Sequence, residues 1–64
     1  MKTKEIIKLI EEDGWYEVRQ SGSHKQYKNN TKSGLVTIPV HRLSNDLPLG
    51  LEKSILKQAQ IIKK

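Results

Sequence analysis

The chain has 64 residues, enough for one domain, spanning residues 1–64, with a small hydrophobic core. It has no cysteine, which excludes disulfides and cysteine-bound metal, and the spacing of its two histidines does not suggest a metal site. Twelve Lys and Arg against seven Asp and Glu give a net charge of +5, which favours a polyanionic partner such as nucleic acid or simply serves solubility. With no membrane-spanning apolar run and no secretory signal, a cytoplasmic protein without a cofactor is expected.

The first predicted element is a helix from about Lys4 to Glu12, with Thr3 as its N-cap. Its apolar residues recur at helical spacing and predict one buried face, made of Ile6, Ile7, Leu9 and Ile10. The helix ends at Asp13-Gly14, where Gly14 suits the left-handed conformation that follows a helix.

Three strands follow, at residues 15–20, 24–29 and 35–40, separated by turn-forming residues. A two-residue turn at Gly22-Ser23 would pair Ser21 with His24 and Val18 with Tyr27. This register places Tyr16, Val18 and Tyr27 on the core face, and Glu17 and Arg19 on the outer face.

The third strand has three inward-facing β-branched residues, Val36, Ile38 and Val40. Adding them to the same core face predicts that Ile38 lies opposite Tyr27. The same register predicts that His41 lies opposite His24, so that both histidines share a polar, basic outer face.

Pro48 opens the last predicted helix, because proline is tolerated in a first helical turn. Its buried stripe consists of Leu51, Ile55, Ala59 and Ile62. A second stripe is polar and is either a solvated face or a track along a phosphate backbone: Lys53, Lys57, Gln60 and Lys64. The element order predicts a two-layer α+β fold (α-β-β-β-α) with a three-stranded antiparallel sheet and both helices on one face. By analogy of element order it matches the double-stranded-RNA-binding domain.

His24 is the residue with the clearest potential for chemistry. Because imidazole exchanges protons near neutral pH, a histidine can take the proton from an RNA 2′-hydroxyl, whose oxygen then attacks the adjacent phosphate without a metal. The neighbouring cations Arg19, Lys25 and Lys28 would hold the phosphate, and His41 would act as the acid or as a second phosphate contact. A lone histidine beside a turn is more often an ordinary surface or capping residue than a catalytic group.

Four stretches together resemble one family: Trp15, Gly22-Ser23-His24-Lys25-Gln26-Tyr27, Thr37-Ile38-Pro39-Val40-His41 and Ser54-Ile55-Leu56-Lys57-Gln58-Ala59. At these separations the chain is similar, from Thr3 to Ala59, to the HicA (YcfA-like) toxins of toxin–antitoxin pairs. Two departures are visible. Gly50 is followed by Leu51 rather than by a hydroxyl residue, and the stretch 42–45 has fewer lysines and glycines than is usual in the family.

The resemblance implies a double-stranded-RNA-binding-like fold and a ribosome-independent mRNA endoribonuclease that inhibits translation. It places the catalytic histidine of the Gly-Ser-His motif at His24, and it implies a HicB-like antitoxin that covers the His24 face. The other residues expected to contact RNA are Arg19, Ser23, Lys25, Lys28, His41, Lys53 and Lys57, and no metal is expected. Two alternatives stay open, a non-catalytic RNA-binding module and a basic protein that binds only an acidic protein partner.

Overall fold

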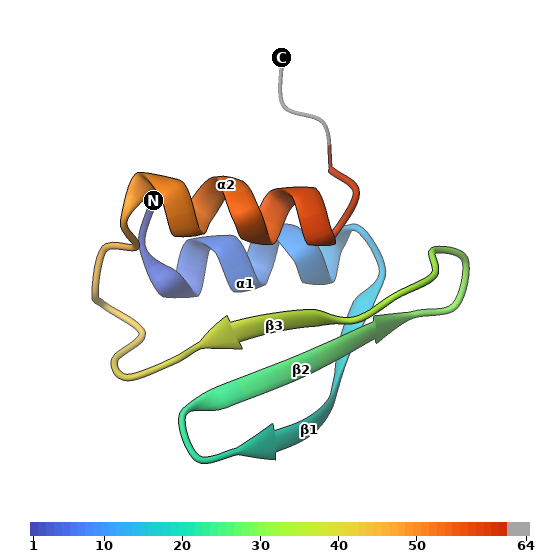
Figure 1. The fold of residues 1–64 in the computed structure, drawn as a ribbon, viewed down its shortest axis with the longest axis horizontal. Coiled ribbons are helices and arrows are strands. Elements are labelled where there is room, and N and C mark those ends of the chain that lie inside the picture. The colour runs from blue at the N-terminus through green and yellow to red at the C-terminus, as the bar shows by residue number, and fades with distance from the viewer. Residues whose placement is uncertain (62–64) are drawn as a thin grey trace.

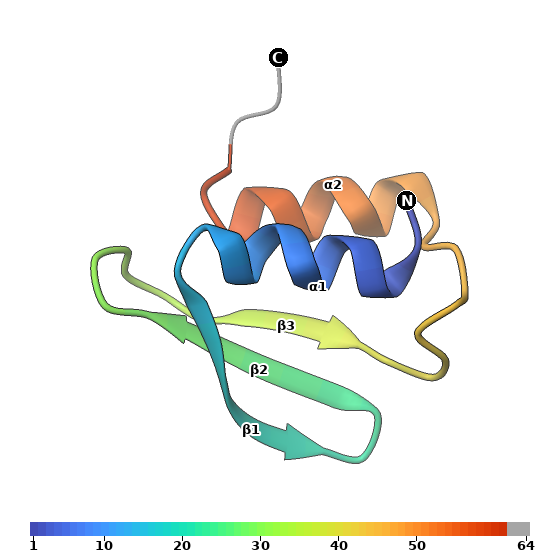
Figure 2. The ribbon, with the colours of Figure 1, turned by 180° about the vertical axis from the view of Figure 1, so that it is seen from behind.

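The computed structural model describes residues 1–61 and has two layers, with both helices on one side of the sheet and the other side open (Figures 1 and 2). Its strands are antiparallel and lie in the order β1-β2-β3, so the α-β-β-β-α prediction is confirmed. Helix α1 contacts β1 and helix α2 contacts β3. The elements are α1 (Thr3–Glu12), β1 (Trp15–Ser21), β2 (His24–Asn29), β3 (Val36–Pro39) and α2 (Leu49–Gln58). Within residues 1–61, neither helix has the length and apolar character needed to cross a membrane.

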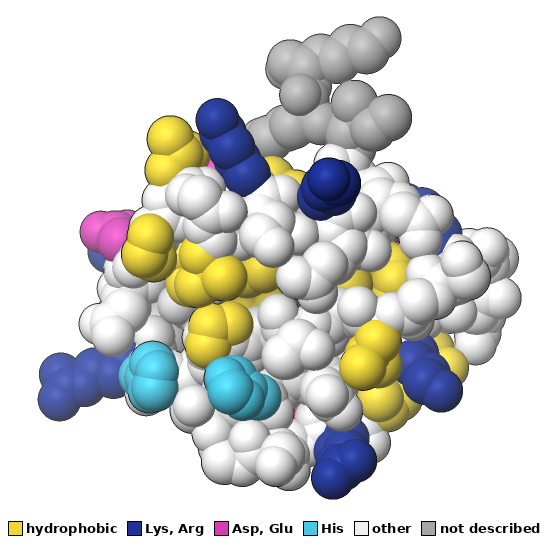
Figure 3. Space-filling model, viewed as in Figure 1, with side chains coloured by type: hydrophobic (Ala, Val, Ile, Leu, Met, Phe, Trp, Pro, Cys, Tyr) yellow, Lys and Arg dark blue, Asp and Glu magenta, His cyan; other side chains and the backbone are white. Residues whose placement is uncertain are grey.

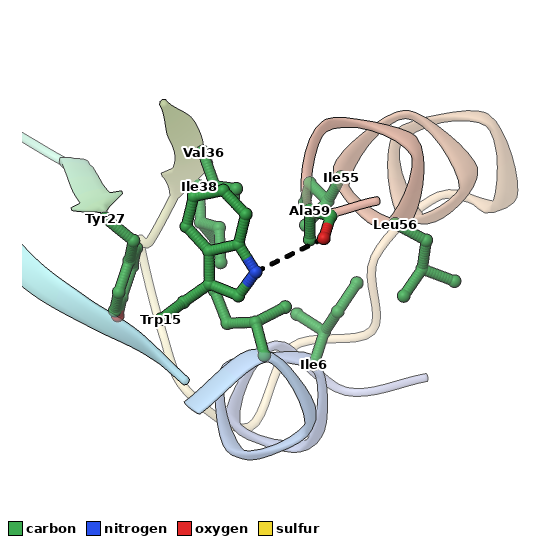
Figure 4. Close-up of a cluster of buried hydrophobic side chains, with 9 residues drawn as sticks. Ile6, Trp15, Tyr27, Val36, Ile38, Ile55, Leu56 and Ala59 are labelled. Atoms are coloured by element: carbon green, nitrogen blue, oxygen red, sulfur yellow. Dashed lines mark hydrogen bonds between the residues drawn. The ribbon is translucent and has the colours of Figure 1, made fainter. Parts of the chain in front are cut away.

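The core fills the space between the two helices and the inner face of the sheet. Figure 4 shows the Trp15 ring lying between the sheet and α2, with its Nε1 donating a hydrogen bond of 3.2 Å to the carbonyl of Ala59. Both layers contribute to this one cluster: Ile6, Ile10, Trp15, Tyr27, Val36, Ile38, Ile55, Leu56 and Ala59.

The start of α1 differs from the sequence prediction by one residue. Lys2, not Thr3, is the N-cap, and Thr3 is the first helical residue. Thr3 is buried, and its N–H (2.8 Å) and its Oγ1 (3.1 Å) both donate to the carbonyl of Asn45, which satisfies these polar groups. The predicted helix end is confirmed, since Gly14 has a φ of +101°.

Strand β1 contains a β-bulge at Val18, which the predicted unbroken ladder did not include. Glu17 pairs with Tyr27 and Arg19 pairs with Gln26, so Val18 has no partner across the ladder. The predicted pairing of Val18 with Tyr27 is therefore wrong. Because residues directly opposite one another share a face, Glu17 lies on the helix-facing side, not on the predicted outer side.

The predicted core face of β1 is also wrong. Tyr16 and Val18 are each 44% exposed, whereas Trp15 is only 2% exposed and supplies the contribution of β1 to the core. The extra residue of the bulge shifts the alternation of faces along β1, so that Trp15 points inward.

Strand β3 faces the core as predicted but pairs with β2 in a different register. Val36 and Ile38 are completely buried, which confirms their inward direction. Val36 lies opposite Tyr27, however, where Ile38 was predicted. The register differs by two residues, a shift that leaves every side chain on its predicted face.

Helix α2 begins at Leu49 with Pro48 as its N-cap, one residue later than predicted. Its buried stripe is confirmed at Ile55 and Ala59, and Leu51 packs against the core as a partly buried residue. Two positions of the predicted stripes, Ile62 and Lys64, lie outside the described residues.

The outer edge of β3 has few free backbone donors. The N–H of Thr37 donates to the side-chain Oε1 of Gln58 on α2 at 3.0 Å, and Pro39 has no N–H. Proline and a covering helix both discourage the addition of another strand.

Burial of Tyr27 makes the stability of the fold sensitive to alkaline pH. Desolvation, followed by the nearby charges of Glu17 and Glu11, raises the pKa of Tyr27 from 10 to about 12. The folded chain therefore favours the neutral phenol, and this contribution is complete below pH 10 and is lost as pH rises toward 12. We expect Tyr27→Phe to flatten the fall in unfolding free energy between these values, as measured by denaturant titration.

The matched control is Tyr16→Phe, which removes a hydroxyl from an exposed ring. An equal flattening in both variants would contradict the assignment of this pH dependence to the buried Tyr27.

Candidate functional site

The turn that precedes His24 is a tight two-residue hairpin turn. Ser21 pairs with His24 as predicted, and Gly22 has a φ of +59° while Ser23 has a negative φ. This is the pattern of a type II′ turn, which requires glycine at its first central position. A Cβ at Gly22 would meet no atom within 4 Å, so the backbone conformation, not lack of space, requires glycine here.

Both carbonyls of the turn accept hydrogen bonds. Gln20 Nε2 donates to the carbonyl of Gly22 at 3.1 Å, and the N–H of Val40 donates to the carbonyl of Ser23 at 2.6 Å. The second bond connects the turn to the end of β3. His24 therefore projects from backbone that is held on two sides, and its imidazole is exposed.

The two histidines do not face each other across the ladder as the sequence analysis predicted. Pro39 lies opposite His24, and His41 comes two residues later, beyond the end of β3. Figure 3 nevertheless shows both histidines on one face of the molecule, in the lower left of the view. His41 is exposed and begins the loop that leads to α2.

The cations near His24 divide between the two sides of the sheet. Arg19 and Lys28 are exposed and have the same parity as His24 in the ladder, so they lie on the open face. Lys25 pairs with the buried Ile38 and makes a 3.4 Å ion pair with Glu17. Lys25 therefore belongs to the helix-facing side. Ser23, another predicted RNA contact, is half-buried in the turn.

Two more of the predicted RNA contacts, Lys53 and Lys57, are exposed on α2. Residues four apart lie on the same side of a helix. Figure 3 shows the basic side chains of α2 above the histidines, with apolar side chains between them. The positive charge of α2 is thus separated from the histidines by an apolar strip.

The family model described as the HicA toxin of bacterial toxin–antitoxin systems matches residues 3–61. The chain belongs to the HicA toxin family. None of the curated proteins compared with the chain matches it. The match runs from the first residue of α1 to beyond the end of α2, so the whole described domain takes part in it.

Membership identifies this HicA chain as the toxin of a toxin–antitoxin pair, and it implies an antitoxin partner. Among residues 1–61, no three His, Asp or Glu side chains gather as a metal site.

The loop between β3 and α2 contains two polar residues that the sequence analysis did not select. Arg42 and Asn45 are exposed, and together with His41 they line a pocket of about 190 Å³. The only signal in the sequence was the basic residue directly after His41. The path of the loop, which brings Asn45 back toward His41, was not encoded in any periodicity.

The turn at Gly22-Ser23 of this HicA chain yields a prediction about two glycines. Replacing Gly22 by alanine forces a side chain into a positive-φ conformation, and we expect a loss of about 1–2 kcal/mol in unfolding free energy. Gly50 is its matched control, because it lies in α2 without a positive φ, and a Cβ added there would also meet no atom within 4 Å. Gly50→Ala should stabilise the chain by about 0.5 kcal/mol.

Denaturant unfolding of both variants checks these opposite signs. A Gly22→Ala variant as stable as the parent chain would contradict the type II′ assignment.

Proposed function

We propose that this toxin is an mRNA endoribonuclease that acts without the ribosome and uses His24 to begin cleavage. The observation that carries the proposal is the placement of His24, an exposed imidazole directly after a turn whose two carbonyls are both hydrogen-bonded. A catalytic group held on rigid backbone keeps its geometry when substrate binds. The family match covers this turn.

In the proposed reaction, His24 accepts the proton of a 2′-hydroxyl as the oxygen attacks the adjacent phosphorus. The new 2′-O–P bond forms as the bond from phosphorus to the 5′-oxygen of the next nucleotide breaks. The leaving oxygen takes its proton from His41 or from water. The products are a 2′,3′-cyclic phosphate and a 5′-hydroxyl.

Basic side chains on two surfaces would hold the RNA backbone. Arg19 and Lys28 share the open face of the sheet with His24. Their positive charge would stabilise the negative charge that develops on the attacked phosphate. Lys53 and Lys57 lie further away on α2 and would contact neighbouring phosphates. Lys25 is a weaker candidate, because Glu17 already partners its ammonium group.

We further propose that the antitoxin partner is HicB-like and acts by covering His24. Because Pro39 and the Thr37–Gln58 bond restrict the edge of β3, we expect contact through side chains, not through an added strand. An acidic surface that meets Arg19 and Lys28 would accelerate association. Co-expression that yields this toxin alone, without its neighbouring gene product, would count against this partner.

The direct test compares the wild type with His24→Ala on a single-stranded RNA. His24 is exposed, so its truncation should leave the fold intact, as circular dichroism will show. We expect cleavage to fall by about 100-fold or more, the usual contribution of a general base, while binding to RNA persists.

Each alternative gives a different result in the same experiment. Equal cleavage by both proteins would remove His24 from the mechanism. Binding without cleavage by the wild type would favour an RNA-binding module, and no binding at low salt would favour a protein that binds only an acidic protein partner.

The contribution of α2 to RNA binding can be measured from its salt dependence. Removing both lysines in Lys53→Ala/Lys57→Ala should reduce the slope of log K against log salt by about 1.4, since each phosphate contact on a single strand contributes about 0.7. The matched control is Lys4→Ala/Lys8→Ala, which removes two exposed lysines of the same spacing from α1. An equal fall in both variants would show that α2 makes no specific backbone contact.

A further inference from the structure

The pocket in the β3–α2 loop has an apolar floor and a polar rim. It lies where this loop meets the first turns of both helices, which start at the same end of the molecule (Figure 1). The partly buried apolar lining residues Pro39, Leu47 and Leu51 are here called the floor, and the exposed polar lining residues, among them His41 and Asn45, are called the rim. A floor of this kind excludes water from a ligand while the rim fixes the orientation of that ligand.

Backbone hydrogen bonds hold the loop in place before any ligand binds. The carbonyl of Asn45 accepts both donors of Thr3, the N–H of Lys4 donates to the carbonyl of Leu43 at 3.0 Å, and the N–H of Leu47 donates to the carbonyl of Met1 at 3.0 Å. These bonds involve the backbone of Asn45 and leave its exposed side-chain amide at the rim. The pocket is therefore pre-formed, which lowers the entropic cost of binding.

The pocket adjoins the position of His24. Pro39 lines the pocket and is also the residue directly opposite His24 across the ladder. Opposite residues in an antiparallel pair have Cα atoms about 5 Å apart. A nucleotide whose phosphate lies at His24 can therefore reach the pocket with its own base or with the base of its neighbour.

Size and chemistry both fit a single ring system. A cavity of about 150 Å³ is known to hold a benzene ring, so the 190 Å³ pocket has room for one nucleobase and is smaller than the pockets that take drug-sized molecules. Unpaired RNA bases are recognised by stacking on histidine or arginine planes and by hydrogen bonds to their edges. His41, Arg42 and Asn45 supply these groups, and the carboxylate of Asp46, which lies 3.8 Å from Lys2 Nζ, adds an acceptor.

We propose that this pocket binds one nucleobase of the RNA, at a nucleotide beside the cleaved linkage. The position beside the cleaved linkage rests on the proposed function, whereas the binding of a base does not. The pocket then selects an unstacked single-stranded base, and the amide of Asn45 contacts its edge.

A base-deletion scan tests the proposal. The probe is a single-stranded RNA oligonucleotide whose 2′-hydroxyls are methylated, so that it cannot be cleaved, together with versions that each lack one base. Binding to the wild-type chain is measured by fluorescence anisotropy. We expect one base deletion to weaken binding by about tenfold, the effect of losing one well-made base contact.

The same scan with Asn45→Ala identifies the pocket. In this variant the intact probe should bind about tenfold more weakly, and deletion of the sensitive base should have little further effect, because the two changes remove one contact. Ser44→Ala is the matched control, since Ser44 is the exposed neighbouring residue and does not line the pocket.

Three results would overturn the proposal. Deletion of any single base could leave binding unchanged, or deletion of the sensitive base could weaken binding equally in Asn45→Ala and in the wild type. The third result is that the probe does not bind at low salt. Cleavage of unmodified RNA is measured separately. A base contact that depends on Asn45 in a chain that does not cleave RNA would retain the pocket and reject the nuclease assignment. Cleavage of RNA by a chain whose binding depends on no single base would retain the nuclease assignment and reject the pocket.

Discussion

The inward position of Trp15 is the constraint on which the rest of the sheet depends. An aromatic side chain buries about 150–250 Å², a large share of so small a core, and the indole also anchors the end of α2 through its bond to Ala59. A two-residue turn at Gly22-Ser23 fixes the pairing of β1 with β2. In an unbroken ladder this pairing would place Trp15 on the same side as His24, away from the core. The bulge at Val18 removes the conflict, so that the tryptophan is buried while the histidine is exposed.

This conflict also explains which parts of the fold the sequence could predict. Periodicity fixes the face of a side chain, so the helices, the inward Val36 and Ile38, and the hairpin turn were all within reach. An extra residue in a strand has no periodic signature, so Tyr16 and Val18 were assigned to the wrong face. The best indication available was Trp15 itself, because an unbroken ladder leaves the largest apolar side chain in water.

The candidate site divides in the same way. His24 and its turn could be located from local sequence, because the glycine requirement of a type II′ turn is local. The position of His41 depended on the register across the long loop between β2 and β3, where a shift of two residues changes the partner and leaves the pattern intact. The pocket depended on the non-periodic 40–48 loop, whose path is set by the hydrogen bonds that Thr3 donates to the carbonyl of Asn45. Under the proposed function, the histidine, its basic neighbours on the open face and the pocket would contact one single-stranded RNA.

The chemical nature of the cleaved ends tests the central claim most directly. If His24 activates the 2′-hydroxyl, wild-type toxin must leave a 2′,3′-cyclic phosphate, or the phosphate that forms on its hydrolysis, together with a 5′-hydroxyl. Mass spectrometry of a cleaved oligonucleotide distinguishes these ends from those left by attack of water. A 3′-hydroxyl with a 5′-phosphate would contradict the account, since it would show that the 2′-oxygen is not the nucleophile and that His24 does not have the role assigned to it.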